Sequence, residues 1–494
     1  MDWYPNWFIA GDARGALNDM IIPTQSPNSD SELTAAHSAY LWLAAAAGAL
    51  GGLLFGYDWV VIGGAKPFYE LYFHLDSPTL QGWEMSCALI GCLIGAVTSG
   101  ALSDRFGRKR MLALAALLFA ISSLGTGLAP QFIAFVSWRM LGGYAIGLAS
   151  GISPMYIAEI SPAGLRGRLV SLNQLAIVFG ILAAQLVNWL IAKPVAPGAS
   201  AQEILLSWNG QCGWRWMFAV TAIPSILFLV SALMVPESPR WLAARGRDRE
   251  ALDVLARIGG EPYAQMVMKD FKATIHAGPK VSILRELSSP GMPRVLLLGI
   301  ALAVLQQWCG INVIFNYAQE IFAAAGYQIS GILFNIVITG AVNVVFTLIA
   351  LGAIDRYGRR FLLLGGVSGL VIIYTVLGFC YHLHLKGKPM LVMVLAAIAC
   401  YAMSLAPATW VVISEIFPNR IRGSAVSIAV TALWTACFIL TYSFPALNAG
   451  LGAAGVFWIY AAICLAGAVF IYLRLPETRG KTLEEIEASI RTGN

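Results

Sequence analysis

The hydrophobic residues of this chain are gathered into long runs that are separated by short polar segments. Each run is long enough to cross a bilayer, because a transmembrane helix needs about 20 mostly apolar residues. The twelve runs cover residues 40–63, 83–103, 111–128, 132–154, 171–192, 216–235, 295–322, 329–352, 361–383, 390–414, 424–447 and 454–474. They lack the strict alternation that is typical of membrane β-strands. The pattern predicts an all-α membrane protein with twelve transmembrane helices.

The composition excludes the main soluble classes. Hydrophobic residues make up 58% of the 494 residues and charged residues 12%, whereas a soluble domain carries about 25% charged residues. Disorder is excluded because it needs low hydrophobicity. The net charge of +6 forms no basic stripe, so nucleic acid is not expected as a partner. The eight cysteines form no CxxC pair, and we expect neither a metal site nor a cofactor.

The basic residues are distributed unevenly between the two sides of the membrane. Most of the 32 Lys and Arg lie in the loops on the same side as the N-terminus. The exceptions are Lys66, Lys193, Arg215, Lys386 and Lys388 in the opposite loops and Arg139 within a span. The positive-inside rule therefore predicts that both termini are cytoplasmic. No Asn-x-Ser/Thr sequon occurs, which favours the inner membrane of a bacterial cell.

Several motifs occur twice. The run Asp104-Arg105-Phe106-Gly107-Arg108-Lys109 after the second span corresponds to Asp355-Arg356-Tyr357-Gly358-Arg359-Arg360 after the eighth. Glu159 and Arg166-Gly167 correspond in the same way to Glu415 and Arg422-Gly423, and Pro236-Glu237 to Pro476-Glu477. Parallel halves around a central site are typical of secondary transporters. The alternative for each repeated loop is a tight turn with anchoring charges.

The repeat divides the chain into five parts. We expect a cytoplasmic N-terminal tail over 1–39, a six-helix bundle over 40–235, a cytoplasmic helical linker over 236–294, a second six-helix bundle over 295–474 and a cytoplasmic C-terminal tail over 475–494. In the linker, Arg240, Arg245, Arg247 and Arg249 are interspersed with apolar residues at helical spacing.

Two charged residues are expected well inside the spans. Asp58 lies in the first span and Arg139 in the fourth. A charge at bilayer depth costs about 2.5–3.5 kcal/mol on insertion scales, so such residues are usually paired and functional. We predict that Asp58 and Arg139 pair and act as a proton switch. A static buried salt bridge is the alternative.

Together these motifs identify a resemblance over about residues 40–490. The two Asp-Arg-x-Gly-Arg loops, Leu141-Gly142-Gly143 through Arg166, the segments from Pro236 to Leu242 and from Pro476 to Leu483, and Gln306-Gln307 with Gly310-Ile311-Asn312 are similar to the signatures of the sugar porter family of the major facilitator superfamily. Within it, the bacterial D-xylose/proton symporters are the most similar, and the animal glucose uniporters are related. The resemblance implies two pseudo-symmetric six-helix bundles that import a monosaccharide with a proton.

The resemblance also implies roles for individual residues. It gives Asp58 and Arg139 the proton-coupling role. The sugar-binding positions that it implies are Gln174, Gln306, Gln307, Asn312, Asn343, Trp410, Trp434 and Phe55. A cytoplasmic gating network of ion pairs would be formed by Asp104, Arg108, Glu159, Arg166, Asp355, Arg359, Glu415 and Arg422, with Glu159 facing Arg166 and Glu415 facing Arg422. Gly310 and Pro407 would let the seventh and tenth helices bend.

Departures from the family pattern leave the substrate open. Ile181, Asn316, Ala406 and Leu433 replace pocket residues that D-xylose symporters carry, and Gln185 offers another amide nearer the outside. A pentose such as xylose, a hexose such as glucose, and inositol all fit this pattern. A proton-independent sugar uniporter is the main alternative function. A sugar-sensing receptor is disfavoured by the short tails, an enzyme has no supporting motif, and we expect the chain to work as a monomer.

Overall fold

The computed structural model describes residues 35–276, 291–417 and 422–477. Most of the two predicted tails lies outside these residues, and helix α1 already begins at Ala35 within the predicted N-terminal tail. Regular structure in the described parts is helical throughout. This is the expected outcome in a bilayer, where a helix satisfies its backbone N–H and C=O groups within one segment.

The helices fall into three groups along the chain. The first group is α1 (Ala35–Phe73), α2 (Pro78–Phe106), α3 (Arg108–Leu128), α4 (Phe132–Ile160), α5 (Arg166–Ile191), α6 (Ala201–Leu206), the π-helix η1 (Asn209–Gly213), α7 (Trp214–Ala219) and α8 (Ala222–Met234). The second is α9 (Pro239–Ala244), α10 (Asp248–Gly259) and α11 (Glu261–His276). The third is α13 (Met292–Trp308), α14 (Ile311–Asn316), α15 (Ala318–Ala324), α16 (Ile329–Tyr357), α17 (Arg359–His382), α18 (Lys388–Met403), α19 (Leu405–Ile416) and α20 (Arg422–Arg474).

The number of membrane spans agrees with the hydrophobic pattern. The described residues contain 11 helical segments that are long and apolar enough to cross a membrane. The last of them, Ser424–Arg474, contains Gly452 with a non-helical backbone (φ 66°, ψ 171°). Since the chain changes direction there, this segment makes two crossings, and each of the twelve predicted runs overlaps one of these helical segments.

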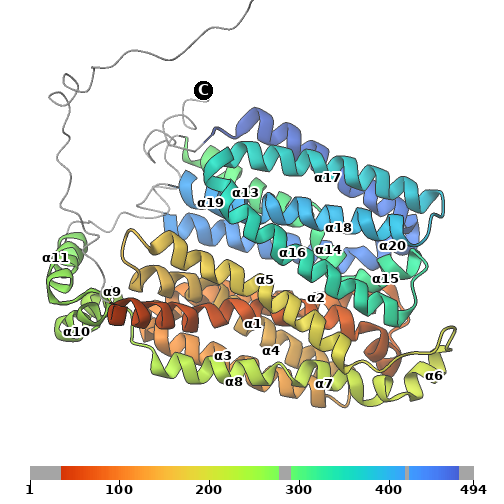
Figure 1. Cartoon of the computed structure of the whole chain (residues 1–494), viewed down its shortest axis with the longest axis horizontal. Helices are drawn as coiled ribbons and strands as arrows, with labels where there is room; N and C mark the ends of the chain where they lie inside the picture. Colours follow the sequence, from red (N-terminus) through yellow and green to blue (C-terminus); the bar gives the residue numbers. More distant parts are fainter. Residues whose placement is uncertain (1–34, 277–290, 418–421, 478–494) are drawn as a thin grey trace, which may run out of the picture.

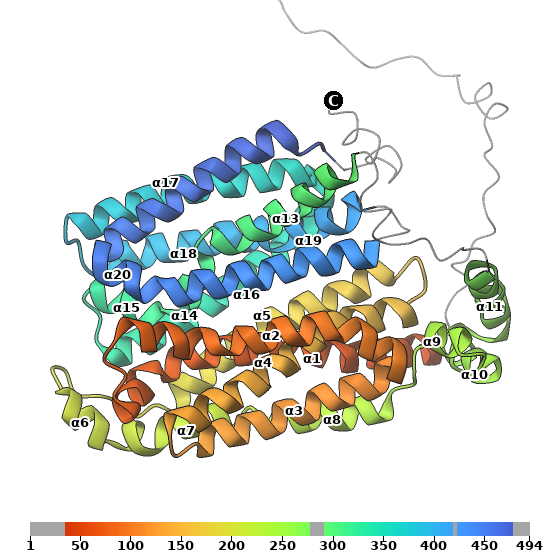
Figure 2. The same cartoon turned by 180° about the vertical axis from the view of Figure 1, so that it is seen from behind.

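The spans form two bundles that lie against each other (Figure 1). Helices α1–α8 make up one bundle and α13–α20 the other, and the view from behind shows the same division (Figure 2). The bundles meet where α2 packs against α20 and α5 packs against α16. The fold is therefore the two-bundle major facilitator fold that the sequence predicts.

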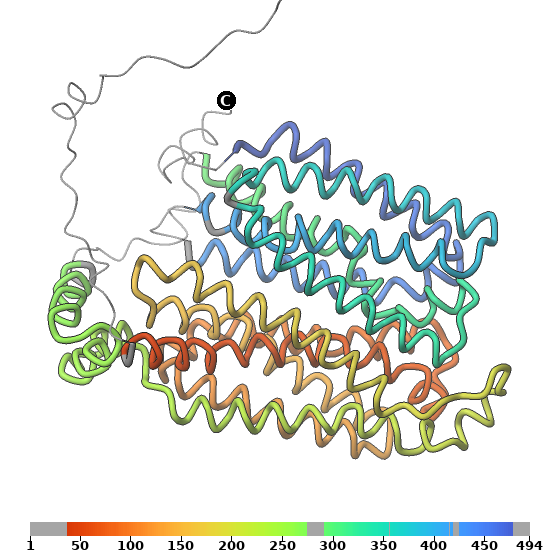
Figure 3. The backbone as a smooth tube through the Cα atoms, in the orientation of Figure 1, coloured from red at the N-terminus to blue at the C-terminus, as the bar shows by residue number. Residues whose placement is uncertain are grey.

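Helices α9, α10 and α11 project from one end of the first bundle (Figure 3). They pack around a small core of their own, formed by Leu242, Ala243, Ala251 and Met268, and α10 also contacts α1. We call this end of the molecule the insert end and the opposite end, where α1 meets α2, the far end.

Two helices are broken near the middle of the membrane. Gly310 adopts a φ of +85°, which a glycine accepts without strain, and it separates α13 from α14. The seventh span is therefore interrupted at Gly310, while its bending during gating stays a prediction. The tenth span breaks at Ser404, three residues before Pro407. Proline lacks the N–H that would bond to the carbonyl of Met403, so the helix is interrupted one turn earlier than the proline itself.

Candidate functional site

Asp58 and Arg139 form an ion pair between α1 and α4. One guanidinium nitrogen of Arg139 lies 2.9 Å from each carboxylate oxygen of Asp58, and a second lies 3.4 Å from the Asp58 carbonyl oxygen. Both residues are only 4% exposed. The guanidinium also lies over the ring of Phe218, 5.6 Å from its centroid. The predicted pairing is therefore present, and both partners belong to the same bundle.

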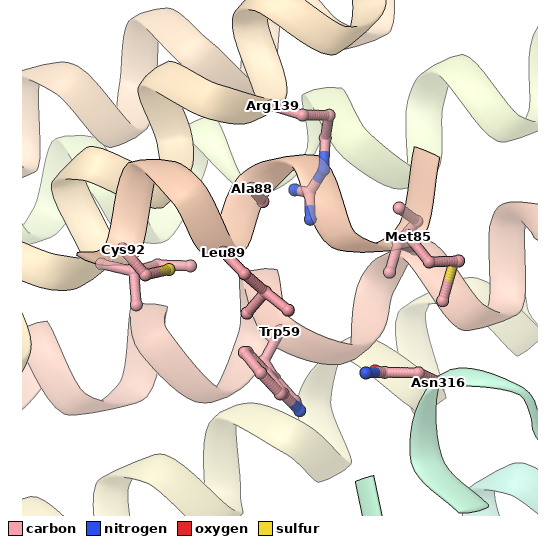
Figure 4. A pocket seen from close by; sticks show the side chains of 9 residues that line it. Trp59, Met85, Ala88, Leu89, Cys92, Arg139 and Asn316 are labelled. Atoms are coloured by element: carbon pink, nitrogen blue, oxygen red, sulfur yellow. The ribbon is translucent and has the colours of Figure 1, made fainter. Parts of the chain in front are cut away.

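A small cavity lies beside this ion pair (Figure 4). Its volume is about 10 Å³, which is room for about one water molecule. Arg139 lines it together with Trp59, Met85 and Asn316. Asn316 belongs to the second bundle, so the cavity brings a polar group of that bundle towards the ion pair. Trp59 was missed by the sequence analysis, although its position next to Asp58 was a usable signal.

Three aromatic rings meet across the interface between the two bundles. The ring of Trp434 on α20 lies 5.8 Å from that of Phe55 and 5.8 Å from that of Trp59, both on α1. The Trp434 side chain is buried, yet its indole N–H has no hydrogen-bond partner among the residues that the structure describes. Flat aromatic faces with an unused donor are suited to one side of a sugar ring.

A chain of amide side chains runs beside these rings in the second bundle. Asn312 donates to Gln307 and approaches the sulfur of Cys437 at 3.5 Å. Gln307 in turn donates to Gln306 at 3.4 Å. Gln306 reaches the carbonyl oxygens of Leu405 and Ala406 at 3.5 and 3.4 Å, close to the break in the tenth span. The amides thus connect the broken parts of two spans.

The remaining predicted sugar contacts lie apart from this chain. Asn343 on α16 is buried, Gln174 on α5 is half-buried and Trp410 on α19 is 37% exposed. In the described part of the chain, no hydrogen bond links them to the amides of α13 and α14. Gln185 instead donates to the Thr339 hydroxyl at 3.4 Å and so joins the two bundles.

The polar and aromatic contacts between the bundles lie in the middle and towards the far end. Besides the rings around Trp434, they include the contact of Lys66 with Glu320, the hydrogen bond from the Val195 amide to the Ser330 hydroxyl at 3.1 Å, and the rings of Trp189 and Phe334 at 5.9 Å. The far end is therefore closed in this structure.

Two ion pairs at the insert end each join helices of a single bundle. Arg108 makes a two-bond contact with Glu159 at 2.9 and 3.0 Å, and Asp104 lies 3.1 Å from the same guanidinium. In the second bundle, Arg359 lies 3.3 Å from Glu415. In this structure Arg108 occupies the Glu159 carboxylate, and Arg166 is exposed. The predicted network of Glu159 with Arg166 belongs to the outward-facing state and stays a prediction. The side chains of Asp355 and Arg422 lie outside the described residues.

The sequence analysis found Glu237 and Glu477 as part of a repeat but gave them no role. The Glu237 carboxylate accepts from the backbone N–H groups of Arg108 and Lys109, at 2.8 and 3.1 Å, where α3 begins. Glu477 accepts in the same way from Arg359 and Arg360 at the start of α17, both at 3.1 Å. The first backbone N–H groups of a helix lack helical partners and favour negative charge. The repeated Pro-Glu segment was the available signal.

Besides Asp58 and Arg139, two further charged residues are buried within the helices that carry the first two spans. Lys66, which was placed in a loop, is 1% exposed within α1, and Glu84 is fully buried within α2. The helix continues past residue 63 because Phe68 and Tyr69 bury their rings completely. Lys66 and Pro67 suggested that the first span ends before them, since a charge followed by proline usually ends a span.

Two helical bundles that meet around buried ionic, amide and aromatic groups define a membrane transporter of the alternating-access type. The chain belongs to the sugar (and other) transporter family, whose model matches residues 44–489. It is thus a multi-pass membrane protein of that family.

Individual relatives are similar over nearly the whole chain. The D-xylose-proton symporter of Escherichia coli strain K12 is 38% identical over 483 residues, which covers 92% of this chain and 96% of the relative. The arabinose-proton symporter of Bacillus subtilis strain 168 is 38% identical, with 94% and 98% covered. The structure of the E. coli xylose transporter in a partially occluded inward open conformation has a TM-score of 0.78 and 35% identity, covering 90% and 100%.

Proposed function

We propose that this chain imports a monosaccharide together with a proton by alternating access of its two bundles. The observation that carries the proposal is the buried Asp58–Arg139 pair beside a cavity that Asn316 of the other bundle also lines. A protonated Asp58 has no charge with which to hold Arg139. Proton binding therefore changes the contacts at the bundle interface, next to the aromatic rings.

The sugar site of this proposal lies between the aromatic and amide groups. Phe55 and Trp434 offer apolar faces, and Gln306, Gln307 and Asn312 offer amide donors and acceptors, while Gln174, Asn343 and Trp410 complete the set when the bundles close. A sugar ring needs both kinds of contact, since its hydroxyls form hydrogen bonds and its ring faces are apolar. A pentose and a hexose both remain compatible.

The gate of this proposal lies at the insert end, which we place in the cytoplasm. We propose that Asp104, Arg108, Glu159, Arg166, Asp355, Arg359, Glu415 and Arg422 rearrange into contacts between the bundles when the inside closes. The present pairs within each bundle and the closed far end support an inward-facing state. Surface pairs are individually weak, so such a gate is reversible.

We place the protein in a bacterial inner membrane as a functional monomer, with both termini cytoplasmic. In this proposal residues 40–235 and 295–474 move as two units against each other, and 236–294 remains on the cytoplasmic side. The lipid bilayer is its surrounding partner. Since its family and its relatives consist of transporters, no enzymatic role is assigned.

The driving force of one proton is sufficient for accumulation. One charge moving across 100 mV contributes about 2.3 kcal/mol, and one pH unit adds about 1.4 kcal/mol. At one proton per sugar, these gradients support a sugar concentration ratio of about a few hundred.

The experiment is sugar uptake into vesicles with and without a proton gradient. We expect the wild-type protein to accumulate a pentose or hexose, and we expect this accumulation to stop when a protonophore is added. The Asp58→Asn variant should lose accumulation but keep sugar exchange, because the sugar contacts remain. Wild-type accumulation that ignores the protonophore would contradict symport, and equilibration without accumulation would favour a uniporter.

The sugar site is tested separately by binding. We expect Trp410→Ala and Gln174→Ala each to weaken binding at least about tenfold, since each removes a contact worth about 1.4 kcal/mol. Phe179→Ala, on the exposed face of α5, is the control. Unchanged binding in both site variants would contradict this placement of the pocket.

A further inference from the structure

A second group of charged residues, two of them fully buried, lies at the far end, two helical turns beyond Asp58. It consists of Lys66 and Glu70 on α1, Glu84 on α2 and Glu320 on α15. The Lys66 ammonium lies 3.2 Å from a Glu70 carboxylate oxygen, contacts a carboxylate oxygen of Glu320, and lies over the Tyr317 ring, 4.7 Å from its centroid. We call these four residues the far-end cluster.

The cluster contains more carboxylate oxygens than it has donors. Glu84 is fully buried, and its carboxyl group forms a hydrogen bond with that of Glu70, which two carboxyl groups can do only when one of them carries a proton. Among the described residues, one oxygen of Glu320 is buried without a hydrogen-bond partner. An isolated buried carboxylate is strongly destabilised unless it is paired or neutralised by a proton.

The surrounding groups do not supply the missing positive charge. The titratable and charged residues that face the cluster from the adjacent helices are Tyr69 on α1, Cys87 on α2, Arg139 on α4 and Tyr317 after α14. Arg139 is paired with Asp58. The hydroxyls of Tyr69 and Tyr317 donate elsewhere, to the Met85 sulfur and the Thr441 carbonyl. Three carboxylates therefore share the single charge of Lys66.

The cluster also joins the two bundles. Lys66, Glu70 and Glu84 belong to the first bundle, whereas Glu320 belongs to the second. Opening of the far end must draw α1 away from α15, and this separates Lys66 from Glu320. The same movement brings water to Glu84 and allows it to ionise.

We propose that Glu84 is a second proton-binding site and that a proton there, together with the Lys66–Glu320 contact, holds the far end closed. In the closed state Glu70 and Glu320 share Lys66, while the protonated Glu84 adds no further negative charge. Opening releases the proton and exposes Glu320. This site lies outside the sugar and proton-coupling residues, and it makes far-end opening depend on the pH of that side.

The distance between the bundles at the far end is the quantity to measure. Spin labels at Gln202→Cys and Lys386→Cys report it, since both positions are exposed and belong to different bundles. Cys212, Cys380 and Cys400 are replaced by serine, and the other five cysteines are buried. Distances are recorded in nanodiscs at pH 5 to 8 without sugar.

We expect the closed-to-open ratio of the wild type to fall as pH rises, by up to about tenfold per pH unit in the range where one proton is released. Glu84→Gln, which mimics the protonated side chain, should reduce the change over this range to less than about twofold. Asp76→Asn, an exposed acid at the same end, should respond like the wild type. A wild-type pH response in Glu84→Gln, or none in the wild type, would overturn the proposal.

Glu320→Gln tests the contact between the bundles without a buried substitution, since this residue is 28% exposed. It should lower the closed-to-open ratio at least about fivefold at pH 5. An unchanged ratio would overturn the role of the Lys66–Glu320 contact, even if Glu84→Gln fails to fold. Because the measurement uses neither sugar nor a proton gradient, it stands whether or not the uptake experiment supports symport.

Discussion

The two buried ionic sites of this protein differ in their balance of charge. Asp58 and Arg139 are one acid and one base in the same bundle, and both carboxylate oxygens face the guanidinium. The far-end cluster has three acids for one base and connects the two bundles. The balanced pair needs no proton to be buried, whereas the cluster does.

This difference separates two tasks that a proton can perform in a transporter. At Asp58 a proton competes with an internal cation, so its arrival frees Arg139 and changes the interface near the sugar site. At Glu84 a proton replaces a missing cation, so its arrival permits burial and closure. Burial of charge is costly in both places, but only the first site has one cation for each acid.

The largest expected effect is on stability and comes from removing each cation in turn. Lys66→Met leaves the buried Glu84 and the partly exposed Glu70 and Glu320 without a cation, and we expect it to lower the free energy of unfolding by about 3–5 kcal/mol. Arg139→Met leaves only Asp58, which a single proton neutralises, and should cost about 1–3 kcal/mol. Melting temperatures of the purified proteins in detergent measure the difference.

Arg215→Met is the control for loss of a cation at the far end, because its guanidinium binds the backbone carbonyls of Gly127 and Ala129. Equal losses for Lys66→Met and Arg139→Met would contradict the contrast between the two sites.

The second-largest expected effect concerns only the ion pair of Asp58 and Arg139. The double variant Asp58→Asn/Arg139→Met removes both charges, and we expect its stability to stay within about 1 kcal/mol of the wild type, since replacing a whole buried pair is often neutral. Its proton-driven accumulation should nevertheless be lost. Thermal melting and vesicle uptake of the same preparation give the two results. A double variant that still accumulates sugar would remove Asp58 from the coupling step.

The smallest effect distinguishes acids within the cluster. Glu70 is partly exposed and lies beside Lys66, whereas Glu84 is fully buried. We expect Glu70→Gln to change the free energy of unfolding by less than about 1 kcal/mol, in line with partly exposed ion pairs. Glu84→Gln should raise the stability at pH 8 more than at pH 5. In the wild type the buried Glu84 must keep a proton, and keeping that proton costs more free energy as the pH rises. A larger effect of Glu70→Gln at pH 8 would reverse the order of the two acids.

Much of this could be predicted from the sequence, and the failures have a common cause. Asp58 and Arg139 were identified because each interrupts a long apolar run. Lys66 was not, because it follows the apolar run of the first span and precedes Pro67, and only the burial of Phe68 and Tyr69 keeps this turn helical. Glu237 and Glu477 were recognised as a repeat, but their role depends on helix ends that lie far away in sequence.

The sequence by itself determined the number of spans, the two-fold repeat and the pair of charges in the membrane interior. These properties are local, since a bilayer requires about 20 apolar residues per span and makes each interrupting charge conspicuous. The tertiary structure alone decided which groups face one another: Arg108 rather than Arg166 beside Glu159, and Glu320 of one bundle beside Lys66 of the other. Such contacts depend on how helices that are distant in the sequence pack against each other, and no local pattern in the chain encodes this packing.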